Sequence, residues 1–160
     1  MQSKTLVSTV GAVFVTALTG GLASRPAEST WYASLKKPSF QPPRRVFPIV
    51  WPILYADIAA VSAATLDHLR SHDRVQARTY TALLTANLVL NASWTWLFFT
   101  RRQLGASAVA AAALTASSAD LTRRAVAAQG PSAGALVAYP AWCAFATVLS
   151  TRIWQLNRGG

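Results

Sequence analysis

The sequence has little charge and little of the chemistry that enzymes usually carry. Of its 160 residues 12% are charged, against about 25% in a typical soluble domain, while 52% are hydrophobic. It has one cysteine and two histidines, so it offers neither a disulfide framework nor a zinc ligand set. It also lacks a phosphate-binding glycine loop and a recognisable pair of nucleophile and general base. We therefore expect no hydrolytic or metal-dependent enzyme, no metal site and no resident cofactor.

Acidic residues are the scarcest charged type. Five aspartates and glutamates stand against fifteen lysines and arginines, a formal net charge of +10. Such an excess suits either a nucleic-acid-binding face or the loops of a membrane protein. Nucleic-acid-binding surfaces interleave basic and aromatic residues along a groove or helix face, whereas here nearly all basic residues lie between apolar stretches. Their placement favours a membrane protein and argues against nucleic acid as a partner.

Five apolar stretches have the length at which a helix crosses a hydrocarbon core of about 30 Å. The first is longer than the apolar region of a signal peptide, so we expect it to be retained as a span. The fourth is mostly alanine, serine and threonine, small residues that allow close helix packing inside the bundle or between two copies of a homodimer. The stretches cover residues 5–24, 46–66, 79–100, 103–121 and 133–151.

The distribution of basic residues predicts the orientation of the chain. Five crossings place the two termini on opposite sides of the membrane. The side that holds the long first loop and the C-terminus collects nine lysines and arginines, and the other side collects six. The positive-inside rule therefore predicts a cytoplasmic first loop and C-terminus and a non-cytoplasmic N-terminus.

A few polar side chains fall inside the apolar stretches, where they are costly unless they form hydrogen bonds or bind a ligand. Asn87 and Asn91 share one helical face with Trp94. Trp142 lies at the centre of the last stretch. The asparagines suit interhelical hydrogen bonding and a ligand pocket equally well. Asp57 lies in the middle of the second stretch, and we expect a neutral carboxyl that donates a hydrogen bond to one of the asparagines.

The segment between the first two stretches is dense in proline, aromatic and basic residues. Residues 31–55 contain five prolines, six aromatics and four basic residues. Pro42 and Pro43 favour extended backbone, while Pro48 and Pro52 suit the early turns of a helix. Long loops in compact proteins tend to be functional, so we expect an ordered lid. A tight tether without a ligand role is the alternative.

At these residues the sequence resembles the TspO/MBR family, which comprises the tryptophan-rich sensory proteins of bacteria and the mitochondrial translocator protein, or peripheral-type benzodiazepine receptor. The likeness covers nearly the whole chain. It is carried by Trp31-Tyr32, the segment from Leu35 to Phe40, Pro42-Pro43, Val46-Phe47-Pro48, the segment from Trp51 to Tyr55, the segment from Asn87 to Asn91 with Trp94 and Phe98-Phe99, Tyr139-Pro140-Ala141-Trp142, and the segment from Ile153 to Asn157.

The resemblance implies one all-α domain over residues 1–160, a five-transmembrane-helix bundle with an ordered loop between helices 1 and 2. It implies a pocket inside the bundle that binds tetrapyrroles such as protoporphyrin IX or haem, for transport, sensing or stress regulation. Membrane lipid and a second copy of the chain are the other expected partners. The implied ligand contacts are Trp31, Tyr32, Pro42, Phe47, Trp51, Asn87, Asn91, Trp94 and Trp142.

Two other functions remain open. Bacterial members have been linked to light-dependent porphyrin degradation, in which Trp51 and Trp142 would be the catalytic redox partners. An ion-coupled transporter using Asp57 is a weaker alternative, because no internal repeat is apparent. The chain also departs from the family: it has Leu149-Ser150 where Leu-Asn is common, and residues 148–158 lack the tyrosine of the proposed cholesterol motif. Sterol is therefore the less expected ligand.

Overall fold

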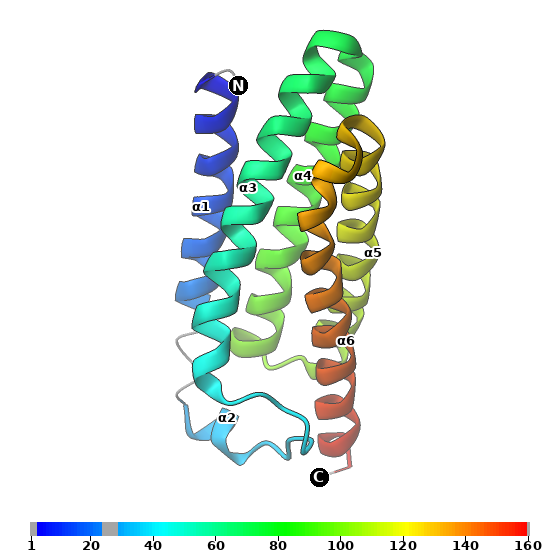
Figure 1. Ribbon diagram of the computed structural model, residues 1–160. Helices are drawn as coiled ribbons and strands as arrows, with labels where there is room; N and C mark the ends of the chain where they lie inside the picture. The colour runs from blue at the N-terminus through cyan, green and yellow to red at the C-terminus, as the bar shows by residue number, and fades with distance from the viewer. Residues whose placement is uncertain (1–2, 24–28, 160) are drawn as a thin grey trace.

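The computed structural model describes residues 3–23 and 29–159, and these residues form a helical bundle without strands. The all-α prediction is confirmed. The long helices run side by side along one axis (Figure 1). They are α1 (Ser3–Ala23), α3 (Phe47–His72), α4 (Arg74–Thr95), α5 (Leu104–Gln129) and α6 (Ala138–Asn157). Shorter elements connect them: α2 (Thr30–Ser34), the 3-10 turns η2 (Arg44–Val46) and η4 (Gly130–Val137), and the π-helical turn η3 (Trp96–Thr100).

Successive long helices alternate in direction, so α1 begins at one end of the bundle and α6 finishes at the other (Figure 1). The segment with α2 lies at the same end as the C-terminus. The described ends of the chain thus lie at opposite ends of the bundle, and the described part of the first loop shares an end with the last residues of α6. The orientation of the chain in a membrane stays a prediction. Arg25, which counts toward the predicted orientation, and residue 24 of the first stretch lie outside the described residues.

The helices extend beyond the apolar stretches that predict them. An apolar window stops at a charged residue, whereas a helix continues while its backbone hydrogen bonds can form. Asp73 separates α3 from α4, and its Oδ1 accepts hydrogen bonds from the backbone N–H of Val75 and Gln76, both at 3.0 Å. The fifth stretch is not one α-helix, because it begins in η4. Pro48 lies in the first turn of α3, as predicted.

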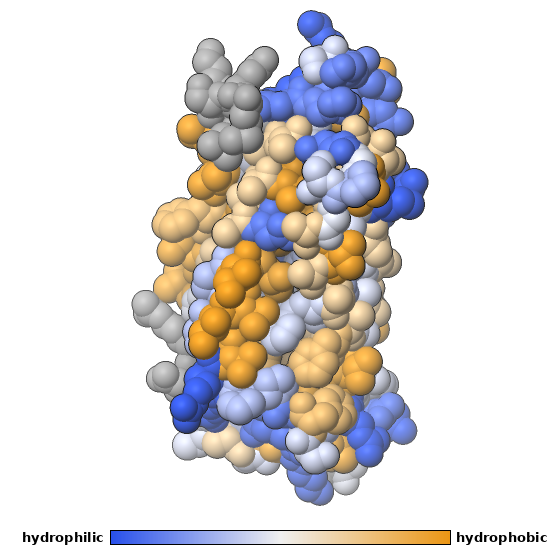
Figure 2. Space-filling model, viewed as in Figure 1, coloured by the Kyte–Doolittle hydropathy of each residue, from blue (hydrophilic) through white to orange (hydrophobic). Residues whose placement is uncertain are grey.

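The surface of the bundle fits an apolar surrounding. Three segments are long and apolar enough to cross a membrane: Arg44–His72, Arg74–Thr100, and Leu104–Asn157, which contains both α5 and α6. α1 contributes a shorter apolar run, Val7–Leu22. Figure 2 shows apolar side chains around the middle of the bundle and hydrophilic ones at its ends. Large apolar side chains such as Phe14 on α1 are exposed, as expected of a surface that faces lipid.

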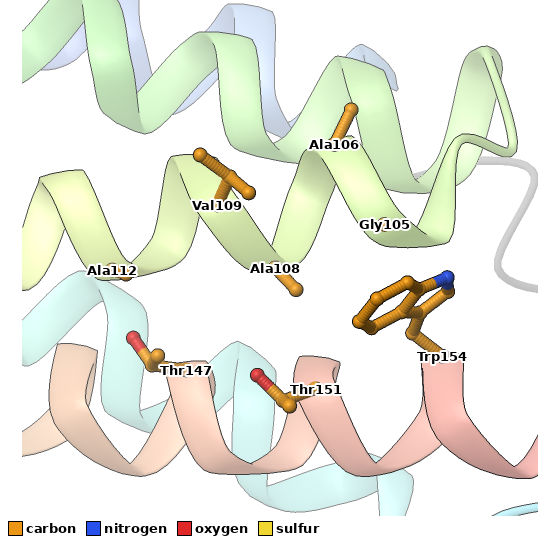
Figure 3. Close-up of a pocket in the computed structure, with 8 residues that line it drawn as sticks. All are labelled: Gly105, Ala106, Ala108, Val109, Ala112, Thr147, Thr151 and Trp154. Atoms are coloured by element: carbon orange, nitrogen blue, oxygen red, sulfur yellow. The ribbon is translucent and has the colours of Figure 1, made fainter.

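Small residues bring α5 and α6 together. Ala108 and Ala111 are buried, and the hydroxyls of Thr115 and Thr147 lie 2.9 Å apart across the two helices. Near the first-loop end, a Cβ on Gly105 would lie 3.1 Å from Nε1 of Trp154. Figure 3 shows this contact beside a groove of about 440 Å³ between α5 and α6. The small residues thus serve packing within the bundle, and the homodimer stays a prediction.

Replacing Gly105 with valine should destabilise the bundle by about 1–3 kcal/mol, because the new methyl groups would push the Trp154 indole out of its contact. Thermal unfolding in detergent measures the loss. Gly11→Val is the control, since nothing lies within 4 Å of a Cβ there. Equal melting temperatures for Gly105→Val and the unmodified protein would contradict this close contact.

Candidate functional site

A chain of hydrogen bonds joins α3, α4, α5 and α6 in the interior, and we call it the polar chain. The Tyr139 hydroxyl donates to Asn87 Oδ1 at 2.8 Å and accepts from Asn91 Nδ2 at 3.2 Å. The Tyr55 hydroxyl donates to Asn91 Oδ1 at 2.9 Å. Asn87 Nδ2 donates to Ser117 Oγ at 3.1 Å. The two asparagines are 0% and 1% exposed, so in this structure they bond helices together, and their contact with a ligand stays a prediction.

Asp57 does not join the polar chain, and the expected hydrogen bond to Asn87 or Asn91 is wrong. Both asparagine side chains already bond to other residues, including Tyr55. Asp57 follows Tyr55 by two residues, about 200° around the helix, which turns it away from α4. Its side chain is half-buried, and its shielded Oδ2 has no hydrogen-bond partner among the described residues.

Aromatic rings gather at the bundle end that holds the first loop, and they form two groups. In the first group Trp51 of α3 lies 6.4 Å from Trp94 of α4, measured between ring centroids. Trp94 lies 6.0 Å from Phe98. Phe98 in turn contacts both Trp31 and Tyr32 of the loop segment, at 6.3 and 6.2 Å. Three predicted ligand contacts thus lie against Phe98, and Trp51 joins them through Trp94. We call these rings the Trp51 group.

The second group connects the start of α3 with α6. Phe47 lies 5.9 Å from Trp142, which lies 5.4 Å from Phe145. Phe145 lies 6.4 Å from Phe40 of the first loop. We call this the Trp142 group. Trp51 and Trp142, the candidate redox pair, therefore belong to different ring groups in this structure.

The polar chain supports the Trp51 group directly. Tyr55, which donates to Asn91, also stacks on Trp51 with ring centroids 5.4 Å apart. Trp94 Nε1 donates to the buried Ser150 Oγ at 3.3 Å. Ser150 is the residue at which this chain departs from the family pattern, and its shorter side chain still holds the indole. These hydrogen bonds fix how α3, α4 and α6 are turned about their own axes, and that orientation positions the rings.

Tyr32 is the centre of the first loop. Its ring is buried, Lys37 Nζ lies 4.6 Å from the ring centroid, and the Arg44 guanidinium lies 5.3 Å from it. Gln41 Nε2 donates to the Tyr32 hydroxyl at 3.1 Å. Burial raises the pKa of Tyr32, while the Gln41 hydrogen bond and the Arg44 charge oppose that rise. Burial and the neighbouring Arg44 charge lower the pKa of Lys37.

The loop is tied to the end of α6 by one amide. Asn157 Oδ1 accepts from the Lys36 backbone N–H at 3.0 Å, and Asn157 Nδ2 donates to the Lys36 carbonyl at 2.9 Å. Nδ2 also donates to the Ile153 carbonyl at 2.8 Å, which fixes the amide on its own helix. We call this arrangement the Asn157 clamp. Pro42 is half-buried in the same loop, before Pro43 with the predicted extended backbone (φ −53°, ψ 144°).

Several residues of this region were not predicted from the sequence to belong to the site. Phe98 lies four residues after Trp94, and Phe145 three residues after Trp142, so helical spacing could have placed each on the face of its tryptophan. Nothing local points to the Asn157 clamp, because its partner is 121 residues away. Two surface grooves, one between α5 and α6 and one along α4, are lined by residues outside the two ring groups.

Comparison with known proteins agrees with this architecture. The profile of the TspO/MBR family matches residues 9–155. The chain belongs to the TspO/MBR family. It is similar to the translocator protein of Ovis aries, with 37% identity over 130 residues, 81% of this chain and 76% of the relative. It is also similar to the tryptophan-rich protein TspO of Archaeoglobus fulgidus, with 31% identity over 158 residues, 98% of this chain and 99% of the relative.

A third TspO/MBR relative is more distant. The tryptophan-rich protein TspO of Bacillus cereus shares 27% identity over 132 residues, 82% of this chain and 84% of the relative. These matches confirm the family resemblance and identify a membrane protein. The roles of the individual site residues stay predictions.

Tyr139→Phe should lower the free energy of unfolding by about 1–2 kcal/mol, because one deleted hydroxyl leaves both asparagine amides short of a partner. Denaturation by SDS in mixed micelles measures the change. Ser93→Ala is the control, since its hydroxyl bonds only to the Val89 carbonyl of its own helix. If both variants unfold alike, the polar chain does not hold the helices together.

Asn157→Leu should release the first loop without unfolding the bundle. The Lys36 amide loses its acceptor, so its hydrogen exchange should accelerate by roughly fivefold, the equivalent of one net hydrogen bond. Hydrogen exchange with mass spectrometry reports the change. Gln155→Leu is the control on the same turn of α6, with its Oε1 bonded only to Arg152. Unchanged exchange at Lys36 in Asn157→Leu would refute the clamp.

Proposed function

We propose that this TspO/MBR protein crosses the membrane five times and binds a porphyrin-type ligand between its two ring groups, beneath the first loop. The observation that carries the proposal is the convergence of aromatic rings from α3, α4, α6 and the loop at one end of the bundle. A planar macrocycle stacks well on indole and phenyl faces, and its apolar body gains from leaving water.

The charge around the ring groups supports the same ligand class. Porphyrins such as protoporphyrin IX carry propionate groups. The adjacent loop carries Lys36, Lys37, Arg44 and Arg45, and three of these four side chains are exposed. Charge-assisted hydrogen bonds from lysine or arginine to a carboxylate would orient the macrocycle with its propionates toward the loop. The excess of basic residues on this side also supports a cytoplasmic first loop and C-terminus.

The packed rings favour a gated pocket. The side chains predicted to contact the ligand pack against one another. Tyr32 joins the loop to Phe98 and Phe99, with ring centroids 6.2 and 5.6 Å apart. Opening the loop would separate these rings and admit the ligand from one side. A gate of this kind suits transport or sensing. The name of the sheep relative, translocator protein, also favours transport.

Porphyrin titration tests the proposal. Protoporphyrin IX added in darkness to the detergent-purified protein should quench tryptophan fluorescence to saturation. Trp142→Phe and Trp51→Phe should each weaken binding by roughly 2–5-fold, because phenylalanine keeps a smaller ring face and loses only part of an aromatic contact's contribution of about 1–1.5 kcal/mol. Trp96→Phe is the control, because Trp96 is 45% exposed and lies under Arg101. Its affinity should equal that of the unmodified protein.

Two outcomes would contradict porphyrin binding among the rings: quenching that does not saturate, or equal affinity in all three variants. The same samples under light separate holding from degradation. Loss of porphyrin absorbance that is faster with protein than in empty micelles, and slower in Trp51→Phe or Trp142→Phe, would favour the enzymatic alternative. Equal loss in all samples would leave binding without degradation.

A further inference from the structure

A second groove lies at the bundle end opposite the ring groups. It measures about 610 Å³ and runs along α4 beside the last turn of α3. Three arginines and three small residues line it: Arg70, Arg74, Ala77, Arg78, Thr81 and Ala82. Figure 2 shows hydrophilic side chains at this end of the bundle, above the apolar middle. We call this feature the arginine groove.

The arginine groove follows the side of α4. Its five α4 residues are spaced 0, 3, 4, 7 and 8 along the helix, which places them on one face. The start of α4 is a separate feature, because Asp73 already accepts hydrogen bonds from the N–H groups of Val75 and Gln76 there. An occupant of the groove is therefore recognised by side chains, and the helix end has no part in it.

Two of the three arginines in the groove keep their positive charge available. Arg74 and Arg78 are exposed, and neither forms an ion pair with an acidic side chain in the part of the chain that the structure describes. Arg123 and Arg124 of α5 differ, because they share Asp120 at 2.6 and 2.7 Å. The groove therefore offers two guanidinium groups to an outside anion, whereas both α5 arginines already bind a carboxylate.

The depth of the groove indicates which anion fits. Arg70 and Arg74 lie at the end of the bundle, while Thr81 and Ala82 lie one to two turns farther along α4, toward the exposed Val89 of the apolar zone. A molecule that fills the groove meets positive charge at one end and an apolar helix face at the other. Arginine pairs bidentately with phosphate oxygens, and basic pockets at the membrane edge suit anionic lipid headgroups.

We propose that the arginine groove binds the headgroup of an anionic phospholipid. Arg74 and Arg78 bind the phosphate, and the acyl chains lie along α4. The proposal is independent of porphyrin binding, because the groove and the ring groups lie at opposite ends of the bundle.

Native mass spectrometry of the full chain, with phosphatidylglycerol and phosphatidylcholine in equal amounts, tests the lipid site. The unmodified protein should retain phosphatidylglycerol preferentially. The double variant Arg74→Gln/Arg78→Gln should lose that preference by about fivefold or more, the equivalent of about 1 kcal/mol for lost phosphate contacts. Arg123→Gln/Arg124→Gln removes the same charge from the same end and should keep the preference, because Asp120 already occupies those arginines.

A second variant separates the groove from diffuse charge. Ala82→Trp fills the groove and leaves every arginine in place, so it too should lower phosphatidylglycerol retention. Thermal unfolding of each variant in detergent reports whether the bundle still folds. No lipid preference in the unmodified protein, equal losses in both arginine double variants, or full retention in Ala82→Trp would overturn the proposal. Displacement of the lipid by millimolar inorganic phosphate would overturn it as well, because the groove would then be a site for free anions.

Discussion

The structure depends on satisfying polar groups in an apolar surrounding. Asn87 and Asn91 are fully buried, so their amides need partners on neighbouring helices, and Tyr139 bonds to both. Each hydrogen bond holds only at one rotation and depth of its helix. Tyr55 belongs to the polar chain and also stacks on Trp51. The helix arrangement that satisfies the asparagine amides therefore also positions the Trp51 group.

The end that carries the rings is closed by contacts between distant parts of the chain. The Asn157 clamp ties the first loop to α6, and Tyr32 places the loop against Phe98. One side of the bundle is thus an aromatic site under a basic loop. The other end carries the arginine groove, for which we propose an anionic phospholipid. Basic residues of this sequence therefore gather at both ends of the bundle, in the first loop and in the arginine groove.

The sequence predicted what depends on local pattern: helices, their order and the positions of the termini. Helix ends were less predictable, because α5 continues past Asp120 and α4 begins before its apolar window. The Asp57 hydrogen bond was wrong because periodicity does not set how each helix is rotated against its neighbours. For the same reason, the sequence did not predict the hydrogen-bond partners of Asn87 or the Asn157 clamp. The nine implied ligand contacts rest on family likeness and stay predictions; all but Pro42 belong to the polar chain or to a ring group.

A double-mutant cycle on the polar chain tests the central claim. Tyr55→Phe and Tyr139→Phe each delete one hydroxyl that bonds to Asn91. Their effects on the free energy of unfolding in mixed micelles are compared singly and together. If the polar chain acts as one unit, the double variant's loss of unfolding free energy should differ from the sum of the two single losses by about 0.5 kcal/mol or more. Losses that add within about 0.3 kcal/mol would show independent bonds and contradict the account.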